Sequence, residues 1–317
     1  MKLIIQIPCH NEESQLPDTL AALPRKVAGF DHVEWLVIDD GSIDGTAAVA
    51  AAAGADHVIR LGHNRGLAGA FMAGIEASLK RGADVIVNTD ADNQYRADGI
   101  PAIVAPILAG QAQLVVGARP IDQIDHFSPV KRWLQKFGSW VVRKVSGTAI
   151  RDAPSGFRAI QRDAAVQLYV FNAYTYTIET IIQAGRLGIP VLSVPVAVNP
   201  PTRESRLIRS EVGYVLRSAA TILRVLVVYR PLQVFTTAAL FTALPGVAAF
   251  ARFLWLYAQG QGDGSIQSLV IGAALIAAGF VLFVGGVLAD LVAANRMLLA
   301  EIRARLLLAE INRRPPE

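Results

Sequence analysis

The most informative segment of the chain is VIVNTDADNQY, at residues 85–95. Its first half is a short apolar run rich in Val and Ile, which predicts a buried strand that ends near Asp90. Asp92 and Gln94 follow directly, and oxygen ligands of this kind suit Mg²⁺ or Mn²⁺. We therefore predict a metal site with Asp92 and Gln94 as ligands and Asp90 as a third ligand or their partner. A solvated turn is the alternative, since a lone D-x-D pattern is common in turns.

The residues on both sides of this segment repeat an alternation of strand and helix. Short apolar runs occur at residues 3–7, 35–39, 57–61 and 114–118. Amphipathic stretches long enough to be helices lie between them, at residues 12–27, 44–53, 66–80 and 98–109. This alternation predicts an α/β fold with a mainly parallel, Rossmann-like sheet covered by helices on both faces. In such sheets ligands bind beyond the carboxyl ends of the strands.

A second acidic group stands at the end of another predicted strand. Asp39 and Asp40 are followed by Gly41, Ser42 and Asp44. Because the carboxyl ends of parallel strands lie along one edge of a sheet, we expect these side chains to share one crevice with Asp90 and Asp92.

The composition indicates that part of the chain lies in lipid. Hydrophobic residues make up 53% of the 317 residues and charged residues only 18%, whereas about 25% charged residues is usual for a soluble domain. The single cysteine, Cys9, excludes a disulfide framework and a Cys-based zinc site, and the five histidines show no metal-ligand spacing.

Positive charge is concentrated in the last third of the chain. Residues 1–202 hold 18 Lys+Arg and 19 Asp+Glu, whereas residues 203–317 hold 12 and 7. The excess therefore lies beside the apolar segments, which favours a bilayer surface with anionic lipid as the partner. A nucleic-acid partner is not expected, because no basic stripe interleaved with aromatic residues occurs in the first 200 residues.

Two apolar segments predict a transmembrane hairpin. Residues 232–257 contain one charge, Arg252, and residues 266–289 contain none. Each exceeds the roughly 20 residues that cross a bilayer core; a pair of buried core helices is the alternative. Arginines flank the hairpin on both sides, so the positive-inside rule predicts that the N-terminal domain and both termini are cytoplasmic. The first apolar run is too short for a signal peptide.

These observations divide the chain into four parts. They are an α/β domain at residues 1–202, a basic amphipathic juxtamembrane helix at 203–230, a transmembrane hairpin at 231–294 and a cytoplasmic C-terminal helix at 295–317. The helix at 203–230 is expected to lie in the headgroup plane, with a solvated helix face as the alternative. The amphipathic run at residues 297–311 could pair with a second copy of the chain or lie on the bilayer.

The motifs together resemble the family 2 glycosyltransferases of GT-A fold. The resemblance covers about residues 1–200 and rests on PCHNE (8–12), VIDDGSIDGT (37–46), HNRGLAGAFMAGI (63–75), NTDADNQY (88–95), GAR (117–119), DAPSGFRA (152–159) and YTIET (176–180). With its arginine-rich joint and C-terminal hairpin, the chain is similar more narrowly to the polyprenyl-phosphate hexose synthases, such as the dolichyl-phosphate mannose synthases and bactoprenyl glucosyltransferases. It lacks the Q-x-x-R-W signature of processive polysaccharide synthases.

The resemblance implies an inverting, metal-dependent transfer of a hexose from a nucleotide-diphosphate sugar, with GDP-mannose and UDP-glucose favoured, to a dolichyl or undecaprenyl phosphate. It places Pro8, Asn11, Glu12 and Asp39 around the base and ribose of the donor, with Asp40 as an alternative and Asp90 as a further donor contact. A helix cap at Asn11 and turn stabilisers at Asp40 and Ser42 are the structural alternative, which can coexist with binding.

The acceptor requires positive charge more than a strong base. A polyprenyl monophosphate has a second pKa near ~6 and is largely dianionic at pH 7. Candidates to hold it are Arg119, Lys131, Arg132, Arg203, Arg206 and Ser155, although a surface salt bridge is the alternative for each arginine. We place Asp152, with Asp92 and Arg119, nearest the reacting centre, where it orients the acceptor phosphate or a neighbouring arginine. A helix or turn cap is the alternative.

The sequence is also compatible with two other functions. The chain could transfer sugar to another membrane lipid whose acceptor is a neutral hydroxyl, which would need a general base. It could also be an inactive membrane scaffold that binds a nucleotide sugar, although the intact acidic motifs argue against this.

Overall fold

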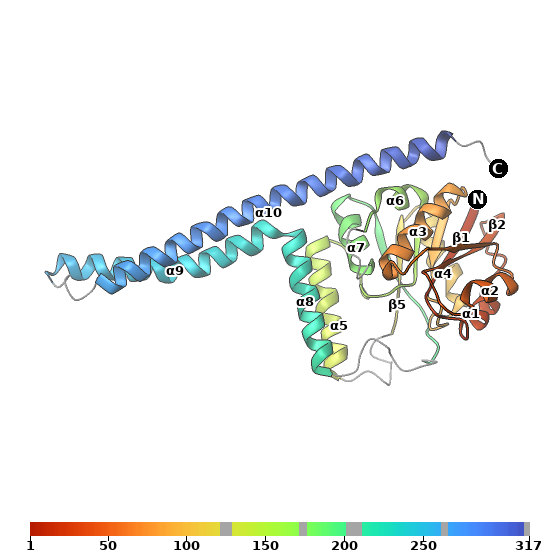
Figure 1. Ribbon diagram of the computed structural model, residues 1–317, viewed down its shortest axis with the longest axis horizontal. Helices are drawn as coiled ribbons and strands as arrows, with labels where there is room; N and C mark the ends of the chain where they lie inside the picture. Colours follow the sequence, from red (N-terminus) through yellow and green to blue (C-terminus); the bar gives the residue numbers. More distant parts are fainter. Residues whose placement is uncertain (121–128, 171–175, 201–210, 261–265, 314–317) are drawn as a thin grey trace. The chain divides into compact units, whose positions relative to one another are not determined.

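The computed structural model describes residues 1–120, 129–170, 176–200, 211–260 and 266–313. The chain forms two compact units (Figure 1). One unit combines Met1–Ser218 with Ala300–Glu317, and the other is Ala219–Leu299.

The first unit contains a seven-stranded sheet in the order β3-β2-β1-β4-β6-β5-β7. The strands are β1 (Lys2–Cys9), β2 (His32–Asp39), β3 (His57–Arg60), β4 (Val85–Asn88), β5 (Leu114–Ala118), β6 (Arg158–Gln161) and β7 (Val191–Pro195). All pairs are parallel except those of β6, which is antiparallel to β4 and to β5. The predicted mainly parallel α/β sheet is confirmed, and β6 and β7 are strands that the sequence analysis did not predict.

Helices cover both faces of this sheet (Figure 1). They are α1 (Leu16–Ala22), α2 (Thr46–Ala52), α3 (Gly66–Lys80), α4 (Ile100–Leu108), α5 (Pro129–Ser146), α6 (Arg162–Gln167) and α7 (Thr177–Arg186), with a 3₁₀ turn at Ala97–Gly99. Along β1, Leu3, Ile5 and Ile7 enter a core with α1 and α4, whereas Ile4 enters a second core with α3 and α6. Successive side chains of a strand point to opposite faces, so both faces of the sheet are buried against helices.

The C-terminal segment of the chain completes the second core. Helix α10 (Ile266–Arg313) is continuous, because its last third consists mainly of good helix formers and contains no break. Where the sequence analysis separates a hairpin from a C-terminal helix at residue 295, the structure has one helix. Ala304 and Leu307 are buried in the core with α3. The apolar face at these two residues therefore already has a partner within the chain.

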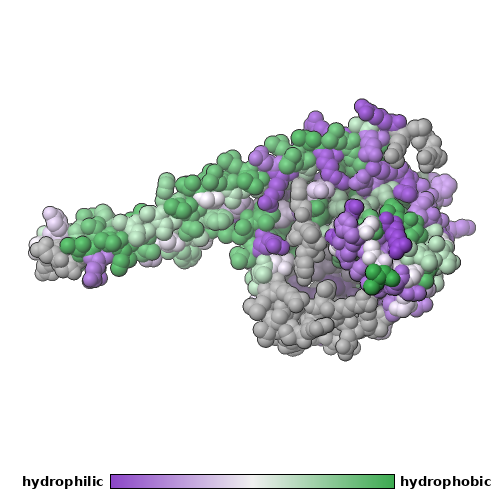
Figure 2. Space-filling model, in the orientation of Figure 1, coloured by the Kyte–Doolittle hydropathy of each residue, from purple (hydrophilic) through white to green (hydrophobic). Residues whose placement is uncertain are grey.

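The other unit consists of the end of α8 (Glu211–Tyr229), all of α9 (Pro231–Ala258) and the first part of α10. Helices α9 and α10 are long and apolar enough to cross a membrane. Only 11% and 17% of their apolar windows are buried, unlike a core helix of a soluble protein, and Figure 2 shows apolar side chains along both. Residues 203–210 of the predicted juxtamembrane helix, which include Arg203 and Arg206, lie outside the described part of the chain.

Glycines hold α9 and α10 together. Gly272, Gly279 and Gly286 recur every seven residues along α10. A Cβ atom on Gly279 would stand 2.9 Å from the carbonyl oxygen of Ala239 and 2.9 Å from Cβ of Ala243. Small residues at seven-residue spacing let two helix backbones approach closely in a lipid environment.

This packing predicts a large difference between two neighbouring substitutions. Gly279→Leu is expected to lower the thermal unfolding midpoint of the protein in detergent by about 2–12 °C, because overpacking a helix contact costs about 1–3 kcal/mol. Gly285→Leu is the matched control, since nothing lies within 4 Å of a Cβ atom there. Fluorescence-monitored melting of both variants checks this, and equal shifts would refute the glycine contact.

Candidate active site

The acidic loop after β4 is held by hydrogen bonds from Asn199, which follows β7 in the chain. Gln94 donates its backbone N–H to Oδ1 of Asp92 at 3.1 Å. The side chain of Asn199 donates to the carbonyl of Asn93 at 2.8 Å, and its backbone N–H donates to the carbonyl of Gln94 at 2.8 Å. Asn93 has φ 53°, a left-handed conformation that Asn tolerates better than most residues. The loop is therefore fixed by long-range contacts at the carboxyl edge of the sheet.

Asp90 lies in a close contact with the segment before β6. A Cβ atom on Gly156 would stand 2.9 Å from Oδ1 of Asp90 and 2.9 Å from the hydroxyl of Tyr176. Burial, with repulsion from the Asp92 carboxylate, raises the pKa of Asp90 to about 7, and Arg119 and Arg158 act in the opposite direction. The charges of Asp92 and Arg119 therefore both lie close enough to Asp90 to change its pKa.

The donor set fits a cation that is shared with a substrate. Among the described residues no three His, Cys, Asp or Glu side chains converge as a ready-made metal cage. Mg²⁺ is commonly held by one or two carboxylates together with substrate phosphates, and Asp90 and Asp92 match that pattern. A divalent cation between them would also offset the repulsion that raises the pKa of Asp90.

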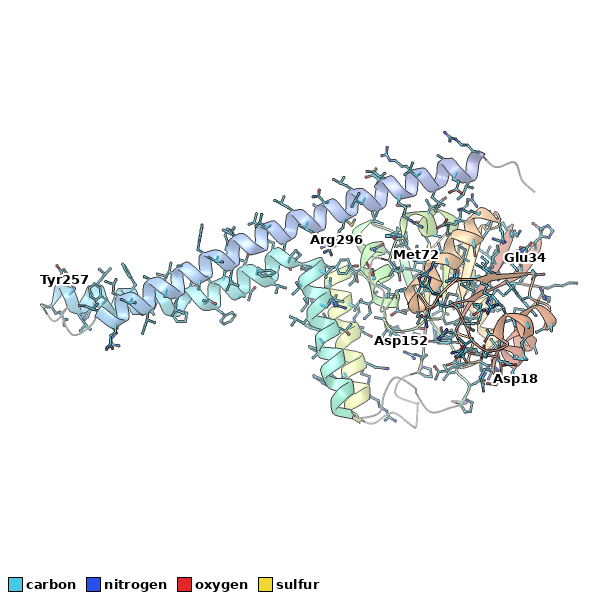
Figure 3. The ribbon with its side chains drawn as sticks, viewed as in Figure 1. Asp18, Glu34, Met72, Asp152, Tyr257 and Arg296 are labelled. Carbon is cyan, nitrogen blue, oxygen red and sulfur yellow. The ribbon has the colours of Figure 1, made fainter. Side chains whose placement is uncertain are left out.

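Arg119 and Asp152 form a buried, forked ion pair. Figure 3 labels Asp152 within the first unit. Arg119 donates from Nε to Oδ2 of Asp152 at 2.7 Å, from Nη2 to Oδ1 at 3.0 Å and from its backbone N–H to Oδ2 at 3.2 Å. Asp152 is 0% exposed. Although burial acts the other way, Tyr95 and Asp152 hold the pKa of Arg119 above its usual range. Both Asp152 oxygens are committed to one guanidinium, so Asp152 is placed to position Arg119.

A buried polar network behind Asp90 was not identified from the sequence. Gln6 donates to Oδ1 of Asn88 at 2.9 Å, and Nδ2 of Asn88 lies 2.9 Å from both the carbonyl of Gly156 and the hydroxyl of Tyr176. Arg158 is fully buried and donates to the carbonyl of Thr177 at 3.1 Å. Asn88, Arg158 and Tyr176 stand inside motifs that the sequence analysis quotes, but their long-range partners are visible only in the structure.

Ser155 faces the protein interior. It is 0% exposed, and its hydroxyl donates to the hydroxyl of Tyr95 at 3.4 Å. The Tyr95 hydroxyl also accepts the backbone N–H of Gly156 at 3.1 Å. Ser155 therefore stabilises its own loop, and a contact with an acceptor phosphate would require that loop to open.

The loop contact at Gly156 yields a prediction about Asp90. Gly156→Ala is expected to displace the Asp90 carboxylate and to weaken Mn²⁺ binding at least tenfold, because the added methyl group needs space that Asp90 and Tyr176 occupy. Gly138→Ala in α5 is the control, since a Cβ atom there meets nothing within 4 Å. Titration of Mn²⁺ followed by electron paramagnetic resonance measures both; unchanged affinity in Gly156→Ala would contradict the contact.

The predicted donor residues lie at the same edge of the sheet. The backbone N–H of Asn11 donates to Oγ of Ser42 at 2.9 Å, and Oδ1 of Asp39 accepts the N–H of Ser42 at 2.9 Å. Oδ1 of Asp40 accepts the N–H of Arg65 at 2.7 Å. The bonds of Ser42 and Asp40 are the turn-stabilising contacts that the sequence left open beside donor binding. The helix cap at Asn11 is not formed, because α1 begins at Leu16 and its N-cap is Gln15.

The remaining donor residues are buried close by. Pro8 lies in β1, and Glu12 follows it with its N–H bonded to Oγ1 of Thr46 at 3.0 Å. The carboxylates of Glu12, Asp39 and Asp90 all act, after burial, to raise the pKa of Cys9. The structure thus brings together the two acidic strand ends.

The predicted acceptor residues are only partly described. Arg132 is partly buried in α5, whereas Lys131 lies in α5 with a side chain outside the described set. Arg203 and Arg206 fall in the segment that the structure leaves undescribed. Among the predicted cationic phosphate ligands whose side chains the structure describes, Arg119 is the one that acts on the pKa of Asp90.

Comparison with known proteins agrees with this fold. Residues 4–168 match the model of glycosyl transferase family 2. The undecaprenyl-phosphate mannosyltransferase of Micrococcus luteus is 30% identical over 67% of this chain and 90% of its own. The polyprenol monophosphomannose synthase of Mycolicibacterium smegmatis is 30% identical over 62% of this chain and 76% of its own.

Among solved structures, glucosyl-3-phosphoglycerate synthase from Mycobacterium tuberculosis with phosphoglyceric acid has a TM-score of 0.56 at 24% identity, covering 70% of this chain and 79% of its own. The same enzyme with Mn²⁺, uridine diphosphate and glucosyl-3-phosphoglycerate has a TM-score of 0.53 at 20% identity, covering 71% and 78%. These likenesses show a glycosyltransferase fold of GT-A type.

The match to the family model and the similarity to the two named transferases define this protein as a glycosyltransferase. The chain belongs to glycosyl transferase family 2.

Proposed function

We propose that the protein transfers a hexose from a nucleotide-diphosphate sugar to a membrane polyprenyl phosphate, with inversion at the anomeric carbon. The observation that carries this proposal is the Asp90–Asp92 pair beside the buried Arg119–Asp152 pair. The names of the two relatives, which act on undecaprenyl phosphate and form polyprenol monophosphomannose, support the acceptor class.

Asp90, Asp92 and Gln94 would hold Mg²⁺ or Mn²⁺, as the Mn²⁺ and uridine diphosphate in a protein of the same fold suggest. When bound, the cation neutralises charge that develops on the leaving nucleoside diphosphate. In this proposal Asn11, Glu12 and Asp39 bind the nucleoside, and Asp90 also contacts the donor. GDP-mannose and UDP-glucose are the favoured donors.

The Arg119–Asp152 pair supports a phosphate acceptor over a neutral hydroxyl. A dianionic phosphate oxygen attacks the anomeric carbon without first losing a proton. A hydroxyl acceptor would need a general base, and both oxygens of Asp152 are engaged by Arg119. Asp152 would hold the guanidinium of Arg119 toward the acceptor phosphate, as a positioning residue.

The membrane features support an acceptor that stays in the bilayer. Moving a polyprenyl tail into water costs ~0.8 kcal/mol per CH₂, so the enzyme must work at the lipid surface. Helices α9 and α10 are candidate spans, and α5 exposes Trp133 (61%) and Trp140 (47%). Trp is enriched at the membrane interface. We infer an integral membrane protein with the catalytic unit and both termini in the cytoplasm.

One experiment separates the acceptor classes. The purified full chain, in detergent with Mg²⁺, is incubated with radiolabelled GDP-mannose, UDP-glucose or UDP-N-acetylglucosamine and with either undecaprenyl phosphate, dolichyl phosphate or diacylglycerol. We expect one donor to label a polyprenyl-phosphate product. Label in diacylglycerol would instead establish a hydroxyl acceptor, and donor binding without transfer to any lipid would indicate a scaffold.

A further inference from the structure

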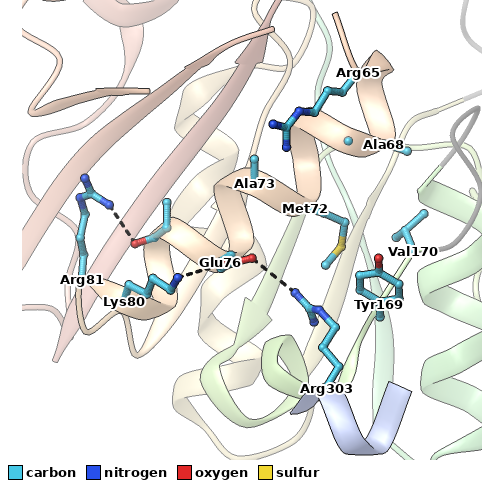
Figure 4. Close-up of a pocket in the computed structure, with 12 residues that line it drawn as sticks. Arg65, Ala68, Met72, Ala73, Glu76, Lys80, Arg81, Tyr169, Val170 and Arg303 are labelled. Carbon is cyan, nitrogen blue, oxygen red and sulfur yellow. Dashed lines mark hydrogen bonds and ion pairs between the residues drawn. The ribbon is translucent and has the colours of Figure 1, made fainter. Parts of the chain in front are cut away.

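A pocket of about 580 Å³ lies outside the candidate active site, on the outer side of α3 (Figure 4). Its walls are α3, the segment at Tyr169 and Val170, and Arg303 from the C-terminal segment of α10. All of these residues belong to the same compact unit. The volume falls within the range of about 300–1,000 Å³ typical of small-molecule sites.

Small and apolar residues make room in this pocket. Ala68, Gly69 and Ala73 line it from α3, so the helix presents little more than its backbone there. Met72 and Val170 add apolar surface. A ligand with a carbon portion would therefore find both space and apolar contact.

The charged lining residues are mainly cations. Arg65, Lys80, Arg81 and Arg303 line the pocket, against one carboxylate, Glu76. Nζ of Lys80 lies 2.7 Å from Oε1 of Glu76 and 3.0 Å from Oε1 of Glu310, which lies just outside the lining. These carboxylates raise the pKa of Lys80. The two carboxylates offset two of the four positive charges, so the net charge of the pocket and its rim is +2. A net positive charge attracts an anion.

The guanidinium of Arg303 is fixed in position by two contacts. Its Cζ atom lies 4.4 Å from the centre of the Tyr169 ring, and its Nη2 lies 3.8 Å from Oε2 of Glu76. The ring face and the carboxylate restrict the guanidinium, so less side-chain freedom is lost when it binds a ligand. Guanidinium groups bind phosphate oxygens in forked pairs.

We propose that this pocket is a second binding site, for a phosphate monoester with a small carbon portion. A phosphate monoester carries about −1.5 to −2 charge at pH 7, which matches the two uncompensated positive charges of the lining. The ligand is either a soluble phosphate monoester or the headgroup of phosphatidic acid, which carries the same group.

The test measures binding to the full chain rather than activity, because Arg65 also contacts Asp40 at the donor edge through its backbone N–H. Arg303→Gln and Arg65→Gln each remove one cation from the pocket. Arg305→Gln is the matched control, since Arg305 is 78% exposed, pairs with Glu301 and does not line the pocket. Arg65→Gln leaves the Arg303–Glu76 contact intact, so it decides the question if Arg303→Gln fails to fold.

In the soluble arm, glycerol 3-phosphate is titrated calorimetrically into the protein in detergent. We expect Kd to rise at least tenfold in Arg303→Gln and in Arg65→Gln and to change less than twofold in Arg305→Gln. In the lipid arm, the protein is melted in phosphatidylcholine nanodiscs with and without phosphatidic acid. Stabilisation by phosphatidic acid that the same two variants lose would identify the lipid as the source. If neither arm distinguishes these two variants from Arg305→Gln, the proposal is wrong.

Discussion

Asp92→Ala is expected to lower kcat of sugar transfer about 100- to 1,000-fold while leaving the protein folded. The Asp92 side chain is partly exposed in a loop that backbone and Asn199 contacts hold in place. Its loss would therefore remove a proposed cation ligand without opening the core. Stabilisation of developing charge by a positioned group is worth about 3–4 kcal/mol in enzymes, which corresponds to this loss of rate.

The matched control is Asp98→Ala, a few residues further along the chain. Asp98 is 60% exposed and pairs with Arg96, so its removal should leave kcat within twofold of wild type. Chelation of divalent cations should reduce wild-type activity to the level of Asp92→Ala and leave the variant unaffected. Full activity of the chelated wild type would count decisively against a metal site at this loop.

Asp152→Ala is expected to lower the free energy of unfolding by about 3–5 kcal/mol, because it leaves the Arg119 guanidinium buried without its counter-charge. The Arg119 side chain is only 12% exposed, so water cannot readily replace the carboxylate. An exposed pair behaves differently: Asp98→Ala should cost less than about 1 kcal/mol. Chemical denaturation of the three proteins, followed by circular dichroism, gives both values.

The double variant Asp152→Asn with Arg119→Gln separates stability from function. Replacing both charges by neutral amides removes the unpaired buried charge, so we expect more than half of the lost stability to return. Transfer activity should stay at least 100-fold below wild type, because the double variant lacks the guanidinium that we propose binds the acceptor phosphate. A double variant that regains activity together with stability would show that the pair is only structural.

The sequence indicates the sheet well because its signals are local. The apolar runs that become β1 to β5 are short and rich in branched residues, and each is followed by polar loop residues. The strand β6 was not predicted because it begins with Arg158, a residue type that is rarely buried. Its guanidinium donates to the carbonyl of Thr177, which lies 19 residues away in the sequence. The strand β7 is short and half-exposed at the sheet edge, which weakens its apolar pattern.

In the candidate site too, local sequence signals predict some features, and contacts between distant residues were not predicted. The acidic pair at Asp90 and Asp92 is evident because parallel strands end at one edge. The forked contact between Arg119 and Asp152 spans 33 residues, and the approach of Gly156 to Asp90 spans 66. Contacts of this kind depend on tertiary packing, so sequence pattern predicts the residues but not the pairing.

Anomalous X-ray diffraction from crystals grown with Mn²⁺ and a nucleoside diphosphate tests the metal site most directly. The account predicts one strong manganese peak about 2.1 Å from carboxylate oxygens of Asp90 or Asp92, with the diphosphate completing its coordination beside Arg119. A diphosphate bound in the same cleft with no manganese peak, or a peak at a different set of ligands, would contradict it.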